Sequence, residues 1–107
     1  DCIEHMASLP DHVFDFSVFS PPFPGVYAYT SESCDMGNTE DLASELKIHF
    51  GYLFRQLSRV VKPGRAIVVH CQQIPRLKRS GGQGLFDFRG TLIRLGQRAG
   101  LVYEYDW

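Results

Sequence analysis

The chain has 107 residues, of which 44% are hydrophobic and 21% are charged, and its formal net charge is −1. This length predicts a single domain with enough apolar residues to bury a core. No run of about eighteen apolar residues is present, so we expect no membrane-spanning helix, and no signal peptide is visible. The three cysteines have no paired short spacing and predict neither a zinc site nor disulfides. We expect them to be buried thiols in a cytoplasmic protein.

The first part of the chain predicts a short helix followed by a strand. We expect the helix over Cys2 to Ser8, closed by Leu9-Pro10-Asp11, and the strand over Val13 to Phe19. This strand is apolar on both faces, as a central parallel strand is. A loop over Pro24 to Asn38 follows it.

The second part predicts two helices, each followed by a strand. Thr39 is a good N-cap for a long helix whose apolar residues recur at helical spacing up to Val60. The later elements are expected as a strand over Ala66 to His70, a loop over Gln72 to Phe86, a helix over Phe88 to Ala99 capped by Asp87, and a third strand over Leu101 to Trp107. Alternating strands and helices imply right-handed crossovers, so we expect an α/β fold with a mostly parallel sheet of three strands.

The two parts of the chain carry opposite charge. Residues 1–46 contain nine acids and no Lys or Arg, whereas residues 47–107 contain all eleven basic residues and only three acids. A clustered excess of basic charge is typical of a protein that binds a polyanion. The alternative is that the acidic part neutralises the basic part once the chain has folded.

The most informative motif is Ser20-Pro21-Pro22-Phe23, at the expected carboxyl end of the first strand. Open α/β sheets bind their ligands at this edge. Two prolines hold the loop rigid, the Ser20 hydroxyl and the Ser20 and Pro21 carbonyls can accept hydrogen bonds, and Phe23 offers a face for stacking. These groups predict a pocket for a flat group with an exocyclic amine, such as a nucleobase. Acceptors there would stabilise the positive charge that develops as the nitrogen attacks an electrophile.

A second loop is expected at the same edge of the sheet, and it is basic. Residues 72–86 contain Arg76, Lys78 and Arg79, which we expect to contact phosphates. Three glycines in this loop predict flexibility, and no P-loop motif is present.

Two segments of the chain resemble the amino-methyltransferases of DNA. Members of that family run Gly-Asp-Cys/Ser, a short helix, Leu-Pro-Asp, an apolar strand and then Ser/Asp/Asn-Pro-Pro-aromatic, and Asp1 to Phe23 follows this order. Leu57 to Val69 is similar to the helix, Lys-Pro-Gly turn and next strand of the family. The resemblance therefore covers nearly the whole chain.

The resemblance implies an enzyme that uses S-adenosyl-L-methionine to methylate an exocyclic base amine in double-stranded DNA, with the base flipped out of the duplex. In that role Ser20 and the Pro21 carbonyl bind the amine, Pro22 helps to hold the loop, and Phe23 stacks on the base. The methyl group passes directly to nitrogen. Asp1 stands where the family places a carboxylate near the adenine of the cofactor. The serine form of the motif favours cytosine N4 over adenine N6.

One part of the family pattern is missing. The glycine-rich cofactor turn, commonly Phe-x-Gly-x-Gly, has no counterpart in this sequence. In one circularly permuted branch of the family the target-amine half precedes the cofactor half, and this chain resembles that first half. We therefore expect residues 1–107 to form a single partial catalytic domain with a Rossmann-like sheet. A C-terminal half, or another copy in a homo-oligomer, would complete it.

Other interpretations of the same residues remain open. A noncatalytic DNA-binding subunit would keep the basic loop without needing Ser20. An RNA or protein amino-methyltransferase could use a similar pocket, although its usual Asn-Pro-Pro-Tyr differs at two positions. Pro21-Pro22 could serve an interaction module, or the motif could be an ordinary turn with Phe23 in the core.

Overall fold

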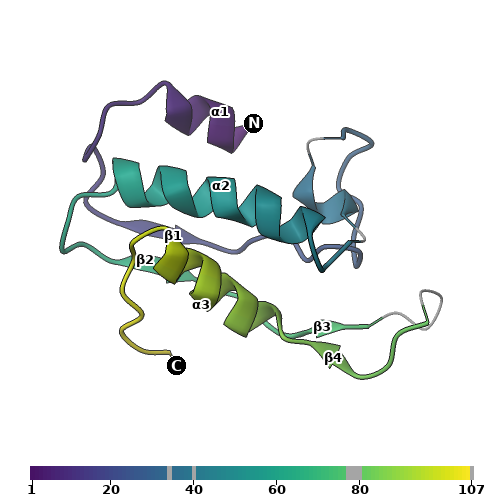
Figure 1. Ribbon diagram of the computed structural model, residues 1–107. Helices are drawn as coiled ribbons and strands as arrows, with labels where there is room; N and C mark the ends of the chain where they lie inside the picture. The colour runs from purple at the N-terminus through teal and green to yellow at the C-terminus, as the bar shows by residue number, and fades with distance from the viewer. Residues whose placement is uncertain (34, 40, 77–80, 107) are drawn as a thin grey trace.

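The computed structural model describes residues 1–33, 35–39, 41–76 and 81–106. In chain order its elements are α1 (Cys2–Ala7), β1 (Ser17–Phe19), the short 3₁₀ helix η1 (Met36–Asn38), α2 (Glu45–Val60), β2 (Ile67–Val69), β3 (Ile74–Pro75), β4 (Leu85–Phe86) and α3 (Phe88–Arg98) (Figure 1). The predicted α/β fold class is confirmed: a small parallel sheet is flanked by helices. Among the described helices, none is both long and apolar enough to cross a membrane.

β1 and β2 form the predicted parallel pair. Val18 pairs with Val68 in the middle of the register, and an isolated parallel bridge joins Phe14 to Val61 upstream. The ladder of β1 is therefore shorter than the strand expected over Val13 to Phe19. Because both strands run in the same direction, the segments that follow them begin side by side at one edge of the sheet.

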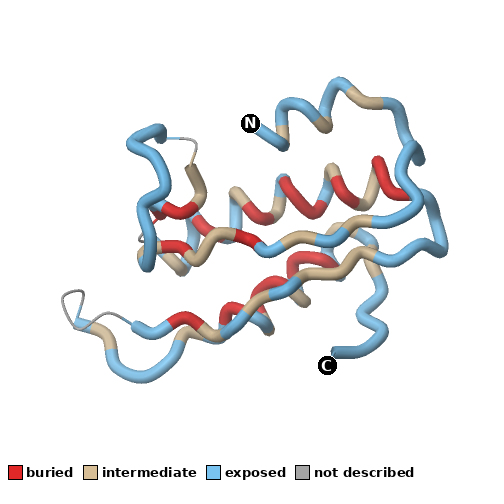
Figure 2. The backbone as a smooth tube through the Cα atoms, turned by 180° about the vertical axis from the view of Figure 1, so that it is seen from behind, coloured by how far each residue is buried: buried red, intermediate tan, exposed pale blue. Residues whose placement is uncertain are grey.

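The core lies between α2, α3 and the inner face of this sheet. Phe50 of α2 and Phe88 of α3 are fully buried and pack edge to face, with ring centroids 5.6 Å apart. Figure 2 shows the buried segments running along both helices. The buried residues of α2 match the predicted helical spacing: Leu46, Phe50, Leu53, Phe54, Leu57 and Val60.

The outer face of β1 is exposed in the described part of the chain, which corrects the prediction of a strand buried on both faces. Phe14, Phe16 and Val18 are 44%, 55% and 63% exposed. Phe19 points to the opposite face and packs against the core. Seen from behind, the strands are mostly half-buried or exposed (Figure 2). The physical reason is that α2 and α3 share one core, on the inner side of the sheet.

The segment after α3 forms no strand over residues 101–106, so this part of the predicted strand from Leu101 to Trp107 is wrong. Residue 107 lies outside the described residues. A strand needs a neighbouring backbone edge, and side-chain bonds hold this segment instead. Arg89 pairs with Asp106 and donates a hydrogen bond to the Tyr103 hydroxyl at 3.1 Å. That hydroxyl donates to Asp106 at 2.6 Å.

Residues 72–86, predicted as a loop, contain an antiparallel pair. β3 and β4 join Ile74 to Phe86 and Pro75 to Leu85. Each strand is two residues long, too short to produce an alternating pattern in the sequence. Ile74 anchors the pair because it is buried in the same core as α2 and α3.

α2 begins at Glu45 and not directly after Thr39, the predicted N-cap. Thr39 is buried and ends η1 in an extended conformation. The Asp41 carboxylate accepts hydrogen bonds from the N–H groups of Ala43 (2.9 Å) and Ser44 (3.0 Å). These bonds form a separate turn ahead of the helix, so the helix starts later than the sequence pattern indicates.

Arg59 near the end of α2 ties α1 to the rest of the molecule. Its guanidinium donates to the carbonyl oxygens of Leu9, at 2.8 Å, and of Met6, and it pairs with Asp11 at 2.8 Å. Met6 lies at the carboxyl end of α1, where helix carbonyls lack partners within the helix. Arg59 therefore holds the carboxyl end of α1, while Ile3 and Met6 pack against the core.

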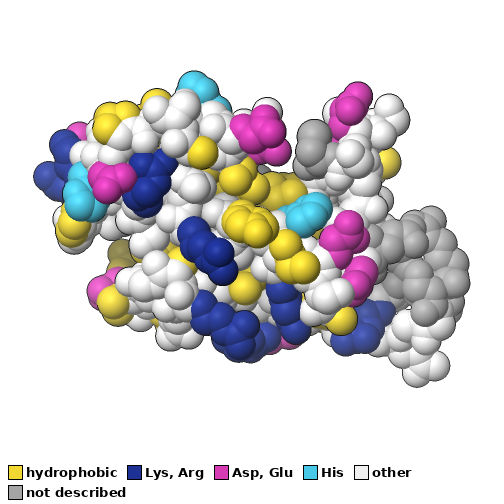
Figure 3. All heavy atoms as spheres, turned by 45° about the horizontal axis from the view of Figure 1, so that its top comes forward, with side chains coloured by type: hydrophobic (Ala, Val, Ile, Leu, Met, Phe, Trp, Pro, Cys, Tyr) yellow, Lys and Arg dark blue, Asp and Glu magenta, His cyan; other side chains and the backbone are white. Residues whose placement is uncertain are grey.

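The acidic and basic parts of the chain neutralise each other only in part. Besides the Arg59–Asp11 pair, Asp15 lies 2.9 Å from the Lys62 ammonium and 3.9 Å from the Arg65 guanidinium. Figure 3 looks onto the face that carries α1, α2 and α3, where Lys and Arg side chains lie beside hydrophobic ones. These pairs join acids of the first part to cations of the second, as the neutralisation alternative expects, while other Lys and Arg side chains remain at the surface.

Replacing Phe88 should destabilise the chain strongly, because the ring is fully buried and contacts aromatic rings on two sides. We expect Phe88→Ala to lower the free energy of unfolding by about 3–5 kcal/mol, measured by urea denaturation. Phe16→Ala, on the exposed face of the sheet, should cost about 1 kcal/mol or less and serves as the control. Equal losses in the two variants would contradict this description of the core.

Candidate active site

The Ser20 hydroxyl and the end of β2 meet at the carboxyl edge of the sheet. The His70 N–H donates to the Phe19 carbonyl at 2.9 Å, which extends the ladder by one bond. The exposed Ser20 Oγ then donates to the His70 carbonyl at 3.1 Å. Because this bond uses the hydroxyl hydrogen, the lone pairs of Oγ remain to accept a hydrogen bond from a ligand.

Two carbonyl oxygens lie beside this hydroxyl in the chain, that of the exposed Ser20 and that of the buried Pro21. Among the described residues, none donates a hydrogen bond to the carbonyl of Ser20 or of Pro21. Pro21 and Pro22 have no N–H and a fixed φ, which keeps this segment out of the sheet ladder. Pro21 is buried and Pro24 is fully buried, so packing holds the loop from below.

The Phe23 ring joins this loop to the core. It is half-buried, and its centroid lies 6.2 Å from that of Phe88 in an edge-to-face arrangement. Part of the side chain remains at the surface. The contact with Phe88 agrees with the interpretation of Phe23 as a core residue, while its partial exposure leaves room for the predicted stacking role.

The Asp35 carboxylate fixes the loop that follows the motif. It accepts hydrogen bonds from the Gly37 N–H (2.9 Å), the Thr30 N–H (2.9 Å) and the Thr30 hydroxyl (3.1 Å). Chiefly because of the Gly37 bond, the pKa of Asp35 lies below its ordinary value. A Cβ at Gly37 would meet the Tyr27 carbonyl oxygen at 2.9 Å, so only glycine fits there. In this loop the backbone at Gly37 thus packs directly against the backbone at Tyr27.

A hollow of about 300 Å³ lies beside the motif, between Pro24-Gly25 and the β3–β4 pair. Arg76 lines it at the end of β3, with its guanidinium carbon 5.9 Å from the centre of the Phe86 ring. Arg76 therefore lies across the hollow from Pro24-Gly25, directly after the motif, whereas none of Ser20, Pro21, Pro22 and Phe23 lines this hollow. Lys78 and Arg79 lie outside the described residues.

Asp1 has a structural role at the start of α1. Its Oδ1 accepts a hydrogen bond from the Ile3 N–H at 2.7 Å, which makes Asp1 the N-cap of this helix. Asp1 is exposed, and none of its hydrogen bonds to described residues reaches the Ser20 loop. The second carboxylate oxygen is left for a ligand.

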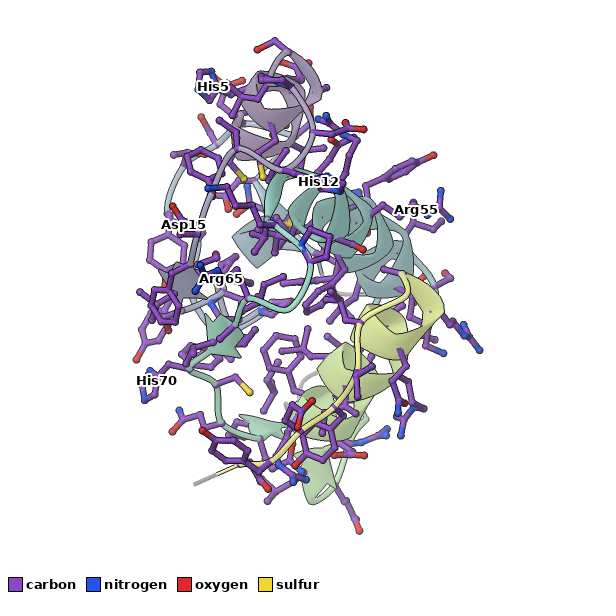
Figure 4. All side chains as sticks on the ribbon, turned by 90° about the vertical axis from the view of Figure 1, so that its left-hand side faces the viewer. His5, His12, Asp15, Arg55, Arg65 and His70 are labelled. Atoms are coloured by element: carbon purple, nitrogen blue, oxygen red, sulfur yellow. The ribbon has the colours of Figure 1, made fainter. Side chains whose placement is uncertain are left out.

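His70 and Cys71 follow β2 and differ in what they contribute. The His70 carbonyl accepts the hydrogen bond from the Ser20 hydroxyl. In the sequence, only the position of His70 at the end of a strand could have suggested this contact. The His70 side chain points outward (Figure 4). Cys71 is half-buried, and burial raises the pKa of its thiol. It is therefore a poor nucleophile.

The other two cysteines are Cys2, the first residue of α1, and Cys34, which follows β1 in the sequence. Cys2 is exposed, so the prediction of a buried thiol is wrong there, because α1 carries it on its outer side. Cys34 lies outside the described residues. Within the part of the chain that is described, no group of His, Cys, Asp and Glu could hold a metal ion.

Comparison with known proteins identifies the fold. No family model and no curated protein matches the chain. A crystal structure of TTHA0409 from Thermus thermophilus, named as a putative DNA modification methylase (selenomethionine derivative), aligns with a TM-score of 0.70 and 19% identity over 94% of this chain and 36% of that one. The same protein complexed with S-adenosyl-L-methionine aligns with a TM-score of 0.64 and 19% identity, over 94% of this chain and 38% of that one.

At this level of identity the likeness shows the fold alone. The chain has the fold of one part of these methylase chains and spans 36–38% of their length.

Acid should loosen the loop that Asp35 holds. Because its pKa is lowered in the folded chain, the stabilisation is present above the ordinary value of 3.8 and is lost as the pH falls through the lower folded value. We expect the amide NMR signals of Thr30 and Gly37 to shift together below about pH 4. Asp35→Asn should remove this transition, whereas a titration of these amides near neutral pH would contradict the assignment.

Proposed function

We propose that the chain forms the amine-binding part of an S-adenosyl-L-methionine-dependent DNA methyltransferase that acts on an exocyclic base amine. The observation that carries the proposal is the set of oxygen acceptors around Ser20, at the edge where open α/β sheets bind ligands. The shared fold with a DNA modification methylase supports it. Because the chain spans 36–38% of those chains, the activity is proposed for the protein that also supplies the cofactor turn.

The chemistry follows from the orientation of these acceptors. Ser20 Oγ gives its hydrogen to the His70 carbonyl and so can only accept from the amine, and the Ser20 and Pro21 carbonyls are available beside it. Two or three acceptors can hold the two amine hydrogens and turn the nitrogen lone pair away from the loop. They also stabilise the positive charge that the nitrogen gains as its bond to the methyl carbon forms. A proton then leaves the nitrogen to water.

Among the described residues, we assign only Asp1 to the cofactor, as a partner of its adenosine part. S-adenosyl-L-methionine, when bound, supplies an electrophilic methyl group on sulfur. Asp1 offers one carboxylate oxygen that could receive an adenine amine or a ribose hydroxyl. The sequence contains no Phe-x-Gly-x-Gly turn to cradle the rest. The amine end of the reaction is therefore the part that this chain supports.

Cytosine N4 is the target that we favour, with adenine N6 next, because of the serine in the motif. We propose double-stranded DNA as the partner, with Arg76, Lys78 and Arg79 as phosphate contacts. The half-buried Phe23 would stack on the base with the part of its ring that remains at the surface.

A noncatalytic DNA-binding subunit is the second candidate. It is favoured by the structural use of Asp1 as a helix cap, which leaves only one carboxylate oxygen of Asp1 for the cofactor. The two candidates differ in whether Ser20 matters for any reaction.

The first test is a calorimetric titration of the folded chain with S-adenosyl-L-methionine. Saturable binding would place a cofactor pocket in this chain or across an oligomer. Transfer of a labelled methyl group to duplex DNA is then measured, and mass spectrometry of the product should detect N4-methylcytosine. Without binding by the chain alone, the same transfer assay is carried out with the longer protein that contains this segment.

In the transfer assay Ser20→Ala should lower the rate about 100-fold, because one acceptor for the developing charge is lost. Ser8→Ala is the matched control, since Ser8 Oγ also donates to a backbone carbonyl, that of His5 at 2.7 Å, but at the end of α1. It should leave the rate unchanged. Methyl transfer that is insensitive to Ser20→Ala, or a methyl group on carbon, would overturn the proposed function.

A further inference from the structure

A second hollow lies on the helical face of the molecule, outside the candidate active site. Its volume is about 270 Å³, and it is bounded by α2 and the carboxyl end of α3. Three of its lining residues are basic, and we call this set the α2–α3 basic groove: Lys47, Arg55 and Arg98, with Ile48, Gly51 and Tyr52 between them.

The three cations of the groove have no acidic partners among the described residues. No Asp or Glu of the described chain lines the groove, and none forms an ion pair with Lys47, Arg55 or Arg98. By contrast Arg94, on the same helix as Arg98, lies 3.7 Å from the Asp87 carboxylate. The described part of the chain therefore supplies no counter-charge to this hollow, and an anion placed between the three cations would be attracted by all of them.

Gly51 opens the hollow between these cations. It lies in the middle of α2, where glycine destabilises a helix relative to alanine. A Cβ at this position would meet no atom within 4 Å, so core packing does not require glycine. The missing side chain leaves space at the point that Lys47 and Arg55 flank along α2, about 12 Å apart by helical rise.

We propose that the α2–α3 basic groove binds the backbone of double-stranded DNA, with a phosphate seated over Gly51 between Arg55, Arg98 and Lys47. Tyr52 forms one wall, and its ring holds the Arg55 guanidinium carbon 5.5 Å from the ring centre. The choice of DNA as the polyanion rests on the proposed function, whereas the anion site itself rests on the unpaired cations and on Gly51.

The groove is separate from the Ser20 pocket. Figure 4 shows Arg55 and His70 on opposite sides of the molecule, with the helices and the sheet between them. The groove therefore holds a stretch of DNA other than the flipped base. Its contacts are to phosphates, which position a duplex without reading its sequence.

Binding of a fluorescently labelled duplex of about 30 base pairs to the full chain, followed by anisotropy between about 50 and 200 mM salt, tests the proposal. Arg55→Gln should weaken binding about tenfold at about 0.1 M salt and reduce the slope of log K against log salt by about 0.9. Arg94→Gln is the matched control, an exposed arginine on α3 that is paired with Asp87, and it should change neither quantity.

Gly51→Met tests the hollow without changing any charge. The side chain fills open space, so the thermal midpoint should stay the same or rise, while affinity for DNA falls about fivefold or more. Unchanged DNA binding in both Arg55→Gln and Gly51→Met would overturn the proposal, as would equal losses in Arg55→Gln and Arg94→Gln. Binding of polyglutamate in place of DNA, lost in Arg55→Gln, would assign the groove to an acidic protein and also overturn it.

These outcomes can be told apart from a failure of the proposed function. If Ser20→Ala abolishes methyl transfer but the groove variants bind DNA normally, only the groove proposal fails. If no methyl transfer occurs under any condition but Arg55→Gln and Gly51→Met still weaken DNA binding, the groove proposal stands and the enzymatic proposal fails.

Discussion

The rest of the structure depends on the burial of one ring, that of Phe88. It begins α3, contacts Phe50 in the middle of α2, and meets Phe23 from the loop after β1. Three segments that are far apart in the sequence are thus joined at a single aromatic contact. Edge-to-face packing gives such a contact a direction as well as energy, so the loop that carries Ser20 has a defined orientation relative to both helices.

The candidate active site has free acceptors because Pro21 and Pro22 have no N–H to donate to a neighbouring strand. A residue with an N–H at position 21 or 22 could continue the ladder with β2, but proline cannot. The strand therefore stops at Phe19, and the Ser20 and Pro21 carbonyls are left without partners among the described residues. Ser20 completes the arrangement because its hydrogen goes to the His70 carbonyl. The hydrogen-bond acceptors at the carboxyl edge of the sheet therefore result from backbone geometry and not from charged side chains.

Local signals in the sequence predicted α1, the buried side of α2, the Asp87 cap of α3 and the parallel pairing of β1 with β2. The first three depend on neighbours within a few residues or on helical spacing, and the parallel pairing follows from the alternation of strands and helices along the chain. The β3–β4 pair was missed because two-residue strands leave no periodic pattern. The strand expected at Leu101 failed because pairing depends on a distant edge, and Arg89, Tyr103 and Asp106 hold the segment by side chains.

For the candidate site, the sequence predicted the residue types but not their bonds. The expected meeting of the two strand ends is seen in the bond from Ser20 Oγ to the His70 carbonyl, whereas Arg76 lies beyond β3, next to Pro24-Gly25. No sequence pattern could show that Ser20 donates to a carbonyl fifty residues away, or that Phe23 contacts Phe88. That Arg55 pairs with no acid in the described part of the chain was equally hidden, because it depends on which acids the fold brings near each cation.

The exposed outer face of β1 has a consequence for the chain in solution. Phe14, Phe16 and Val18 form a line of apolar side chains along a two-stranded sheet whose outer edges carry unpaired backbone groups in the described residues. Such a surface favours association in two ways: its apolar patch can be buried against another molecule, and its open edges can pair with another strand. In a concentrated sample two chains can meet through these faces, so an environment-sensitive dye should fluoresce with the folded chain, and light scattering should rise with concentration before any unfolding occurs.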